Sequence, residues 1–173
     1  MTQDKLKQFQ KKDKSILVSG NNLNKIHFML YSKSAEYAIQ TMIYLSENPS
    51  DKPVMIATIA ESYNIPYNFL AKIVQTLVKR RLVVTKRGRN GGINLARKSN
   101  NIYLNEIVDA IDGPPPEKEL CAIGLDLCDD ETPCPLHNQW KPIRKSIRAM
   151  LTHESLEELA HRVINKRKIM HPD

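Results

Sequence analysis

The sequence contains few of the residues that mark secreted or membrane proteins. Of its 173 residues three are cysteine and one is tryptophan. No apolar run approaches the ~20 residues of a membrane-spanning helix, and the lysine-rich amino terminus lacks the apolar stretch of a secretory signal. Three cysteines cannot all pair with one another. We therefore expect a cytoplasmic protein with reduced thiols and no membrane partner.

Positive charge is concentrated in the first part of the chain. The formal net charge is +7, with +4 over residues 1–28, +7 over residues 29–98 and −4 over residues 99–173. A basic segment favours a polyanionic partner, although charge alone is equally compatible with a solvated surface. Residues 1–28 show no strong periodicity and are predicted to form a disordered basic arm.

Apolar periodicity from residue 31 onward predicts a mainly helical fold. We expect helices over residues 31–47, 55–63, 67–81, 104–112, 135–151 and 155–165. Pro66 suits the start of the third helix, and Ser155 with Glu158 forms a capping box for the last one. The third helix is predicted to turn inward Phe69, Leu70, Ile73, Val74 and Leu77. The helix over 135–151 should carry an apolar stripe of Trp140, Ile143, Ile147 and Met150 or Leu151. The basic residues 166–168 are interpreted as a charged tail.

A short helix, a tight turn and a basic helix predict a helix-turn-helix unit. Two β-rich runs around a Gly-rich segment at 85–92 predict a hairpin, or wing, directly after it. In such a unit the third helix meets the major groove and basic wing residues suit the minor groove. The predicted DNA contacts are Tyr67, Asn68, Ala71, Lys72, Lys86, Arg87, Arg89 and Gly91. Each alone could be an ordinary surface residue, but the series of elements favours DNA.

All three cysteines, Cys121, Cys128 and Cys134, lie within fourteen residues, and His137 follows. Structural zinc sites use closer cysteine pairs, whereas gaps of six and five residues suit an iron–sulfur cluster. Cys134 precedes a predicted helix, whose dipole would lower the pKa of its thiol. His137 could add a fourth bond or simply lie at the surface. Zinc and metal-free redox thiols are the alternatives.

Four segments together resemble the IscR/NsrR/CymR family of bacterial winged-helix regulators. They are YSKSAEYAIQTMIYLSE, IPYNFLAKIVQTLVKRRLV, the wing KRGRNGGINLA and the segment C-x6-C-x5-CPLHNQW. The likeness covers about residues 30–163. It implies a homodimer that pairs through the long helix after the cysteines and binds a near-palindromic operator in double-stranded DNA. It also implies that Arg87 reaches the minor groove and that residues 67–72 face the major groove.

The same resemblance implies that the three cysteines hold an iron–sulfur cluster whose state tunes DNA affinity. His137 matches the histidine ligand of the iron–sulfur-homeostasis branch, which favours a 2Fe–2S cluster. Glu36 matches a carboxylate ligand of the nitric-oxide-sensing branch, donated by the partner subunit to a 4Fe–4S cluster. The chain departs from the family in its first cysteine gap, six residues against five. It departs again at Ala71, where the homeostasis branch has a glutamate, so its operator preference should differ.

The expected organisation is a winged helix-turn-helix domain at 29–113, a linker and cluster-binding loop at 114–134, and a dimerisation helix with a final helix at 135–173. The expected function is a DNA-binding transcriptional regulator, a repressor and not an enzyme. It would sense iron–sulfur status, redox state or nitric oxide. The competing hypotheses are a thiol or iron–sulfur redox enzyme, and a zinc-stabilised DNA-binding module without sensing.

Overall fold

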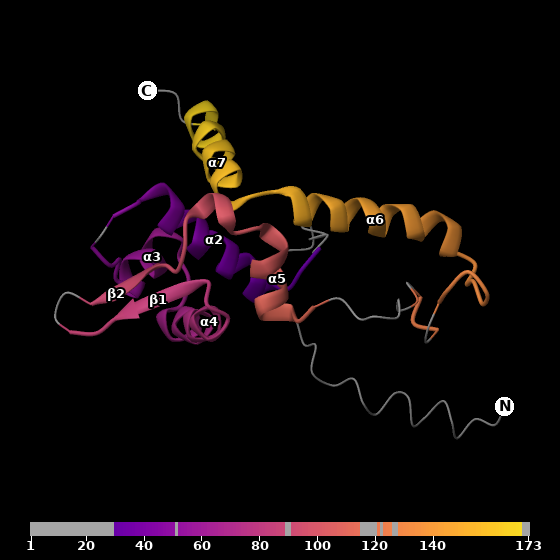
Figure 1. The fold of residues 1–173 in the computed structure, drawn as a ribbon, viewed down its shortest axis with the longest axis horizontal. Helices are drawn as coiled ribbons and strands as arrows, with labels where there is room; N and C mark the ends of the chain where they lie inside the picture. Colours follow the sequence, from indigo (N-terminus) through magenta and orange to yellow (C-terminus); the bar gives the residue numbers. More distant parts are fainter. Residues whose placement is uncertain are drawn as a thin grey trace, which may run out of the picture.

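The computed structural model describes residues 30–50, 52–88, 91–114, 121, 123–125 and 128–170, so the predicted basic arm and Arg89 lie outside the described residues. The described elements, shown in Figure 1, follow one another in the order α2 (Lys33–Glu47), α3 (Ile56–Ser62), α4 (Tyr67–Lys79), β1 (Val83–Lys86), β2 (Gly92–Leu95), the 3-10 helix η1 (Ser99–Asn101), α5 (Leu104–Asp112), α6 (His137–His153) and α7 (Leu156–Met170). The mainly helical winged fold that the sequence predicts is confirmed.

Helix α2 lies at the centre of the core because its apolar residues occupy more than one face. Ala35, Ala38 and Met42 are fully buried, and α4, α5 and α7 all pack against this helix. Its start is fixed to the end of α5. The Ser32 hydroxyl accepts a hydrogen bond from the Ala35 amide (3.1 Å), while the Ser32 amide donates to the Asp112 carboxylate (2.8 Å).

Helices α3 and α4 form the helix-turn-helix. Asn64 lies in the turn after α3 and has a positive φ of 51°, a conformation that asparagine tolerates well. Pro66 is the N-cap of α4. The buried side of α4 is Leu70, Ile73, Val74 and Leu77. The prediction for Phe69 was wrong: its side chain is 41% exposed. It lies at the edge of the buried stripe and packs edge-on against Tyr37, with ring centroids 5.8 Å apart.

An isolated β-bridge, which was not predicted from the sequence, joins the wing to the segment before α3. Strands β1 and β2 pair antiparallel, and Val54 pairs with Ile93 through two backbone hydrogen bonds of 3.0 and 2.8 Å. A Cβ atom on Gly92 would stand 2.3 Å from the Val54 carbonyl oxygen, and one on Gly91 would stand 2.5 Å from the Lys86 carbonyl oxygen. Both glycines are therefore required by the close approach of backbone within the wing.

Helix α6 extends away from the rest of the molecule, and the segment that leads into it lies at its far end (Figure 1). It begins at His137 with Leu136 as N-cap, two residues after the predicted start. His137 is its one buried residue. Ile143 and Met150, from the predicted apolar stripe, are 48% and 47% exposed. Leu151, at the end of this stripe, packs against the core.

Helix α7 begins at the predicted capping box but continues past its predicted end. The Ser155 hydroxyl donates to the Glu158 carboxylate (2.9 Å) and accepts from the Glu158 amide (3.3 Å). At the other end the Arg167 guanidinium donates to Glu47 (2.7 Å) and to the Tyr63 hydroxyl (2.9 Å). The basic residues 166–168 are therefore not a plain tail, because Arg167 ties the last turns of α7 to the helix-turn-helix.

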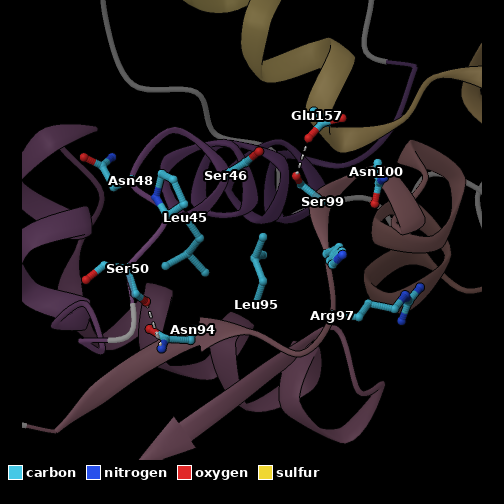
Figure 2. Close-up of a pocket in the computed structure, with 12 residues that line it drawn as sticks. Leu45, Ser46, Asn48, Ser50, Asn94, Leu95, Arg97, Ser99, Asn100 and Glu157 are labelled. Atoms are coloured by element: carbon cyan, nitrogen blue, oxygen red, sulfur yellow. Dashed lines mark hydrogen bonds between the residues drawn. The ribbon is translucent and has the colours of Figure 1, made fainter.

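A polar hollow of about 790 Å³ lies between the end of α2, β2, η1 and α7 (Figure 2). Hydrogen bonds join its walls: the Asn94 amide donates to the Ser50 carbonyl oxygen (3.4 Å), and the Ser99 hydroxyl donates to the Glu157 carboxylate (3.5 Å). The hollow therefore lies among contacts that hold β2 to the segment after α2 and η1 to α7. No helix among the described residues is long and apolar enough to cross a membrane.

Candidate functional site

Half of the residues predicted to read DNA lie on α4. Tyr67 is 54% exposed, Asn68 and Lys72 are exposed, and Ala71 is half-buried. They stay accessible because the opposite side of α4 is buried against the core. Residues at the start of an exposed helix can meet base edges in the major groove.

The wing presents a second group of predicted DNA contacts. Lys86 and Arg87 are exposed, and Gly91 closes the tip by donating its amide hydrogen to the Gly88 carbonyl oxygen (2.9 Å). Arg89 lies outside the described residues. A glycine at position 91 keeps the tip narrow, since any side chain there would strike the Lys86 carbonyl oxygen.

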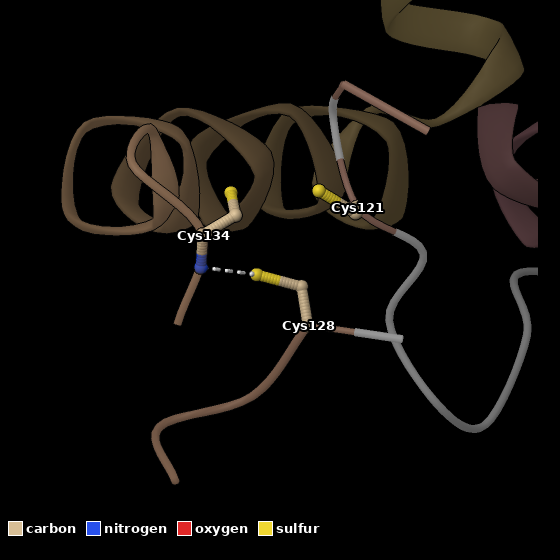
Figure 3. A group of neighbouring side chains, drawn as sticks. All are labelled: Cys121, Cys128 and Cys134. Atoms are coloured by element: carbon tan, nitrogen blue, oxygen red, sulfur yellow. Dashed lines mark hydrogen bonds between the residues drawn. The ribbon is translucent and has the colours of Figure 1, made fainter. Parts of the chain in front are cut away.

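The side chains of the three cysteines lie close together and form a second candidate site, apart from the predicted DNA contacts. Their Sγ atoms all lie within 4.8 Å of one another, and Figure 3 shows the three side chains facing one another beside α6. Cys121 and Cys128 are buried and Cys134 is half-buried. The Cys134 amide donates to the Cys128 sulfur (3.4 Å), which holds the two ends of the intervening loop together. Three sulfurs this close provide the donor set of a metal centre.

His137 lies against Cys128 of this group. Its Nδ1 atom is 3.0 Å from the Cys128 Sγ atom and its Nε2 atom is 3.0 Å from an Asp130 carboxylate oxygen. The ring is only 3% exposed. Asp130 is also bound by the Lys141 ammonium group at 2.6 and 2.7 Å. Neither Asp130 nor Lys141 was predicted from the sequence, although Lys141 follows His137 by four residues and so lies on the same side of the helix.

Hydrogen bonds and burial shift the pKa values of two of the thiols in opposite directions. The pKa of the Cys128 thiol is lowered, first by the Cys134 amide and then by His137. The pKa of the Cys134 thiol is raised, chiefly by burial. The predicted lowering at Cys134 was therefore wrong, because α6 begins three residues later and leaves this thiol outside its first turn.

Hydrogen bonds shift the pKa values of the histidine and its carboxylate partner in opposite directions. The pKa of His137 is raised, first by the hydrogen bond to Cys128 and then by the one to Asp130. The pKa of Asp130 is lowered, mainly by the hydrogen bond from Lys141. The site therefore combines thiols, an imidazole and an ionised carboxylate within hydrogen-bonding distance of one another.

Glu36, the alternative fourth ligand, lies in the first turn of α2. Its carboxylate accepts hydrogen bonds from Lys33 (2.6 Å) and Gln40 (3.3 Å). These contacts are within its own helix. Glu36 is not part of the group of close metal-ligating side chains that the three cysteines form.

Known proteins share this arrangement of elements. The family model for Rrf2, described as an iron-dependent transcriptional regulator, matches residues 31–162. A Mycobacterium tuberculosis protein named as a transcriptional regulator of the helix-turn-helix type is 33% identical over 132 residues, which cover 76% of this chain and 81% of that protein. The transcriptional regulator IscR of Xenorhabdus nematophila is 29% identical over 131 residues, or 76% of this chain and 79% of its own.

A solved structure agrees with the sequence relatives. CymR, the global cysteine regulator of B. subtilis, is 26% identical and superposes with a TM-score of 0.66 over 78% of this chain and 98% of its own. The family match, the relatives and the fold all point to transcriptional regulators and not to enzymes. The chain therefore belongs to the Rrf2 family of iron-dependent transcriptional regulators.

Proposed function

We propose that this protein is a homodimeric, cytoplasmic repressor whose affinity for a near-palindromic DNA operator depends on an iron–sulfur cluster. Cys121, Cys128 and Cys134 would hold the cluster. The observation that carries this proposal is the convergence of the three sulfurs, all within 4.8 Å of one another. Thiolates bind iron–sulfur clusters, zinc and copper, and the iron dependence in the family description favours iron.

The three thiols are chemically suited to an iron–sulfur cluster, while the short distances between their sulfurs also suit a single zinc ion. A single tetrahedral ion with metal–sulfur bonds of 2.3 Å holds its sulfurs about 3.8 Å apart. A cluster spreads its ligands over several irons and would require the sulfurs to separate. The six- and five-residue gaps give the segment the length to do so. A zinc-stabilised regulator is the second candidate, favoured by the compact spacing.

The fourth ligand would decide the type of cluster. His137, in contact with Cys128, supports a 2Fe–2S cluster held within one chain. Glu36 of α2 would instead complete a 4Fe–4S cluster from the partner subunit. We favour His137, because its ring is already buried against the cysteines.

DNA reading is assigned to the exposed start of α4 and to the wing. Asn68 can pair with adenine and Lys72 can reach guanine or phosphate. Arg87 suits a narrow minor groove, where the negative potential is strongest. The full proposed contact set is Tyr67, Asn68, Ala71, Lys72, Lys86, Arg87, Arg89 and Gly91.

The exposed apolar side of α6 supports pairing of two chains. Leu136, Ile143 and Met150 are each 45–48% exposed, which leaves apolar surface in water that a second copy would cover. Two-fold pairing also matches a two-fold operator, whose half-sites repeat about every 34–36 Å. We therefore assign dimerisation to α6.

The fold connects the cysteine site to the helix-turn-helix and wing, the proposed DNA-reading unit of each subunit. When bound, the cluster supplies a centre that responds to oxidation, nitric oxide or iron supply. Helix α6 starts at His137 inside the cysteine site and leads directly into α7, which packs on α2. If the cysteine segment became more or less ordered, the relative position of the two DNA-reading units in the dimer would thus change. A tenfold change in operator affinity requires only ~1.4 kcal/mol of differential binding.

An assay of iron, inorganic sulfide and zinc on protein purified without oxygen, together with its visible spectrum, tests the cofactor. We expect coloured protein with iron and sulfide, and colourless protein after Cys134→Ala. One equivalent of zinc with neither iron nor sulfide would select the second candidate instead.

The same spectrum identifies the fourth ligand. His137→Ala should change the spectrum if His137 is a ligand, and Glu36→Ala should change it if Glu36 is. His161→Ala is the matched control, since His161 is an exposed residue of α7. If neither variant differs from wild type, both assignments fail.

A further inference from the structure

We propose that Asp130 is a positioning residue of the cysteine site. It fixes His137 in the tautomer that carries hydrogen on Nε2, and so directs the lone pair of Nδ1 toward the cysteine sulfurs. This inference rests on the proposed metal binding by the cysteines and His137, and it assigns Nδ1 as the ligating atom.

The contacts form a continuous chain from the sulfur to the protein surface. Cys128 Sγ lies 3.0 Å from His137 Nδ1, and His137 Nε2 lies 3.0 Å from Asp130 Oδ1. The Lys141 ammonium group holds both Asp130 oxygens at 2.6 and 2.7 Å. The two ring nitrogens thus face opposite partners, and the 3% exposure of the ring leaves little room for another orientation.

In the neutral ring the two partners favour hydrogen on Nε2, because the Cys128 thiol can donate its own hydrogen and the Asp130 carboxylate cannot. A carboxylate ionised at neutral pH can only accept a hydrogen bond, so Nε2 must donate to Asp130. In the neutral ring Nδ1 then keeps its lone pair, which faces Cys128. Histidines that bind metals usually donate their other N–H group to a carboxylate or carbonyl oxygen, which orients the ring and makes it a stronger ligand.

Lys141 in turn holds the carboxylate in place. His137 and Lys141 lie one turn apart on α6, so the same helix carries both partners of Asp130. The Asp130 side chain itself is 73% exposed. It is therefore held by these two contacts rather than by packing, and its replacement should not unfold the chain.

The neighbouring acid provides a matched control. Asp129 directs its Oδ1 atom to its own turn, where it accepts from the Glu131 amide (3.1 Å) and from the amide and hydroxyl of Thr132 (2.7 and 2.8 Å). Asp129→Asn keeps this acceptor and removes one negative charge from the same loop. Asp130→Asn removes the same charge but replaces the anionic partner of His137.

Titration of the metal-free protein with Co²⁺ in the absence of oxygen measures the effect, because thiolate-bound Co²⁺ absorbs visible light. We expect Asp130→Asn to lower Co²⁺ affinity by about 10-fold or more, within the 10–100-fold range typical of such partners. Asp129→Asn should stay within about twofold of wild type. In a His137→Ala background the two Asn variants should behave alike, because Asp130 acts through His137.

The tautomer is measured directly by long-range ¹H–¹⁵N NMR correlations of metal-free protein, at a pH where the ring is neutral. Wild type and Asp129→Asn should show His137 with hydrogen on Nε2, and Asp130→Ala should lose this preference. A wild-type ring with hydrogen on Nδ1, or equal Co²⁺ affinity of the two Asn variants, would overturn the proposal. Protein that lacks iron but shows the expected Co²⁺ and NMR results would refute only the cluster.

Discussion

Replacement of Arg167 by alanine should destabilise the protein through a carboxylate more than one hundred residues away. The Glu47 side chain is only 9% exposed. One of its oxygens accepts from Arg167, and the other is buried without a hydrogen-bond partner among the described residues. Arg167→Ala would leave a buried charge without its ion-pair partner, and would also remove the hydrogen bond to the Tyr63 hydroxyl.

The size of the effect follows from the exposure of the two partners. Removing one partner of a fully buried ion pair costs about 3–5 kcal/mol, whereas exposed pairs contribute about 0–1 kcal/mol. Here Glu47 is buried but the Arg167 side chain is 48% exposed, so water can partly solvate the carboxylate. We therefore expect Arg167→Ala to lower the free energy of unfolding by about 1–3 kcal/mol.

Urea unfolding of the metal-free protein measures this difference. Lys168→Ala is the matched control, because Lys168 is the next residue of α7 and is exposed; it should change stability by less than about 0.5 kcal/mol. Combining Arg167→Ala with Glu47→Gln should recover part of the loss, since no charge then stays buried. Equal stability of Arg167→Ala and Lys168→Ala, or purely additive losses in the double variant, would refute the reasoning.

Three further predictions concern the wing and the last helix. Gly92→Ala should lower the free energy of unfolding by about 1–3 kcal/mol through overpacking, because its Cβ would stand 2.3 Å from the Val54 carbonyl oxygen. Urea unfolding should show lower stability, and DNA affinity should also fall. Unchanged values would contradict the role of the contact between Val54 and the wing. Arg87→Ala should lower DNA affinity and reduce the slope of log affinity against log salt by about one charge; an unchanged slope would place Arg87 away from phosphate. Ser155→Ala should cost about 0.5–2 kcal/mol at neutral pH. The pKa of Glu158 is lowered by the Ser155 hydrogen bonds. The contribution of Glu158 to stability is therefore present above its unfolded-state pKa and is lost as pH falls through its folded-state pKa. If the destabilisation by Ser155→Ala does not shrink in acid, this assignment is contradicted.

Local patterns in the sequence were sufficient to predict the helices and the wing. The apolar spacing of α4, the Pro66 break and the Ser155–Glu158 capping box each depend on residues within a few positions of one another. The structure confirms these elements. The exposed position of Phe69 was not predicted, because a residue beside an apolar stripe cannot be assigned to core or surface by periodicity alone.

Contacts between distant segments could not be predicted in the same way. Val54 joins the wing although the chain around it has no strand pattern, and α7 is extended by the Arg167–Glu47 ion pair. At the cysteine site the candidate ligands and their spacing could be recognised in the sequence. The approach of Asp130 to His137 and Lys141 could not, because it depends on how the loop before α6 folds. Metal ligands follow a recognisable spacing, whereas the residues that orient them need not.

Operator affinity with and without iron tests the central claim most directly. The DNA would be selected from random sequences by the anaerobic protein, and binding would be measured at one fixed salt concentration, before and after a chelator removes the iron. We predict that affinity changes about tenfold or more in wild type, and that Cys134→Ala binds like the iron-free protein under both conditions. Identical binding curves for iron-loaded and iron-free wild type would contradict control of DNA binding by the cysteine site.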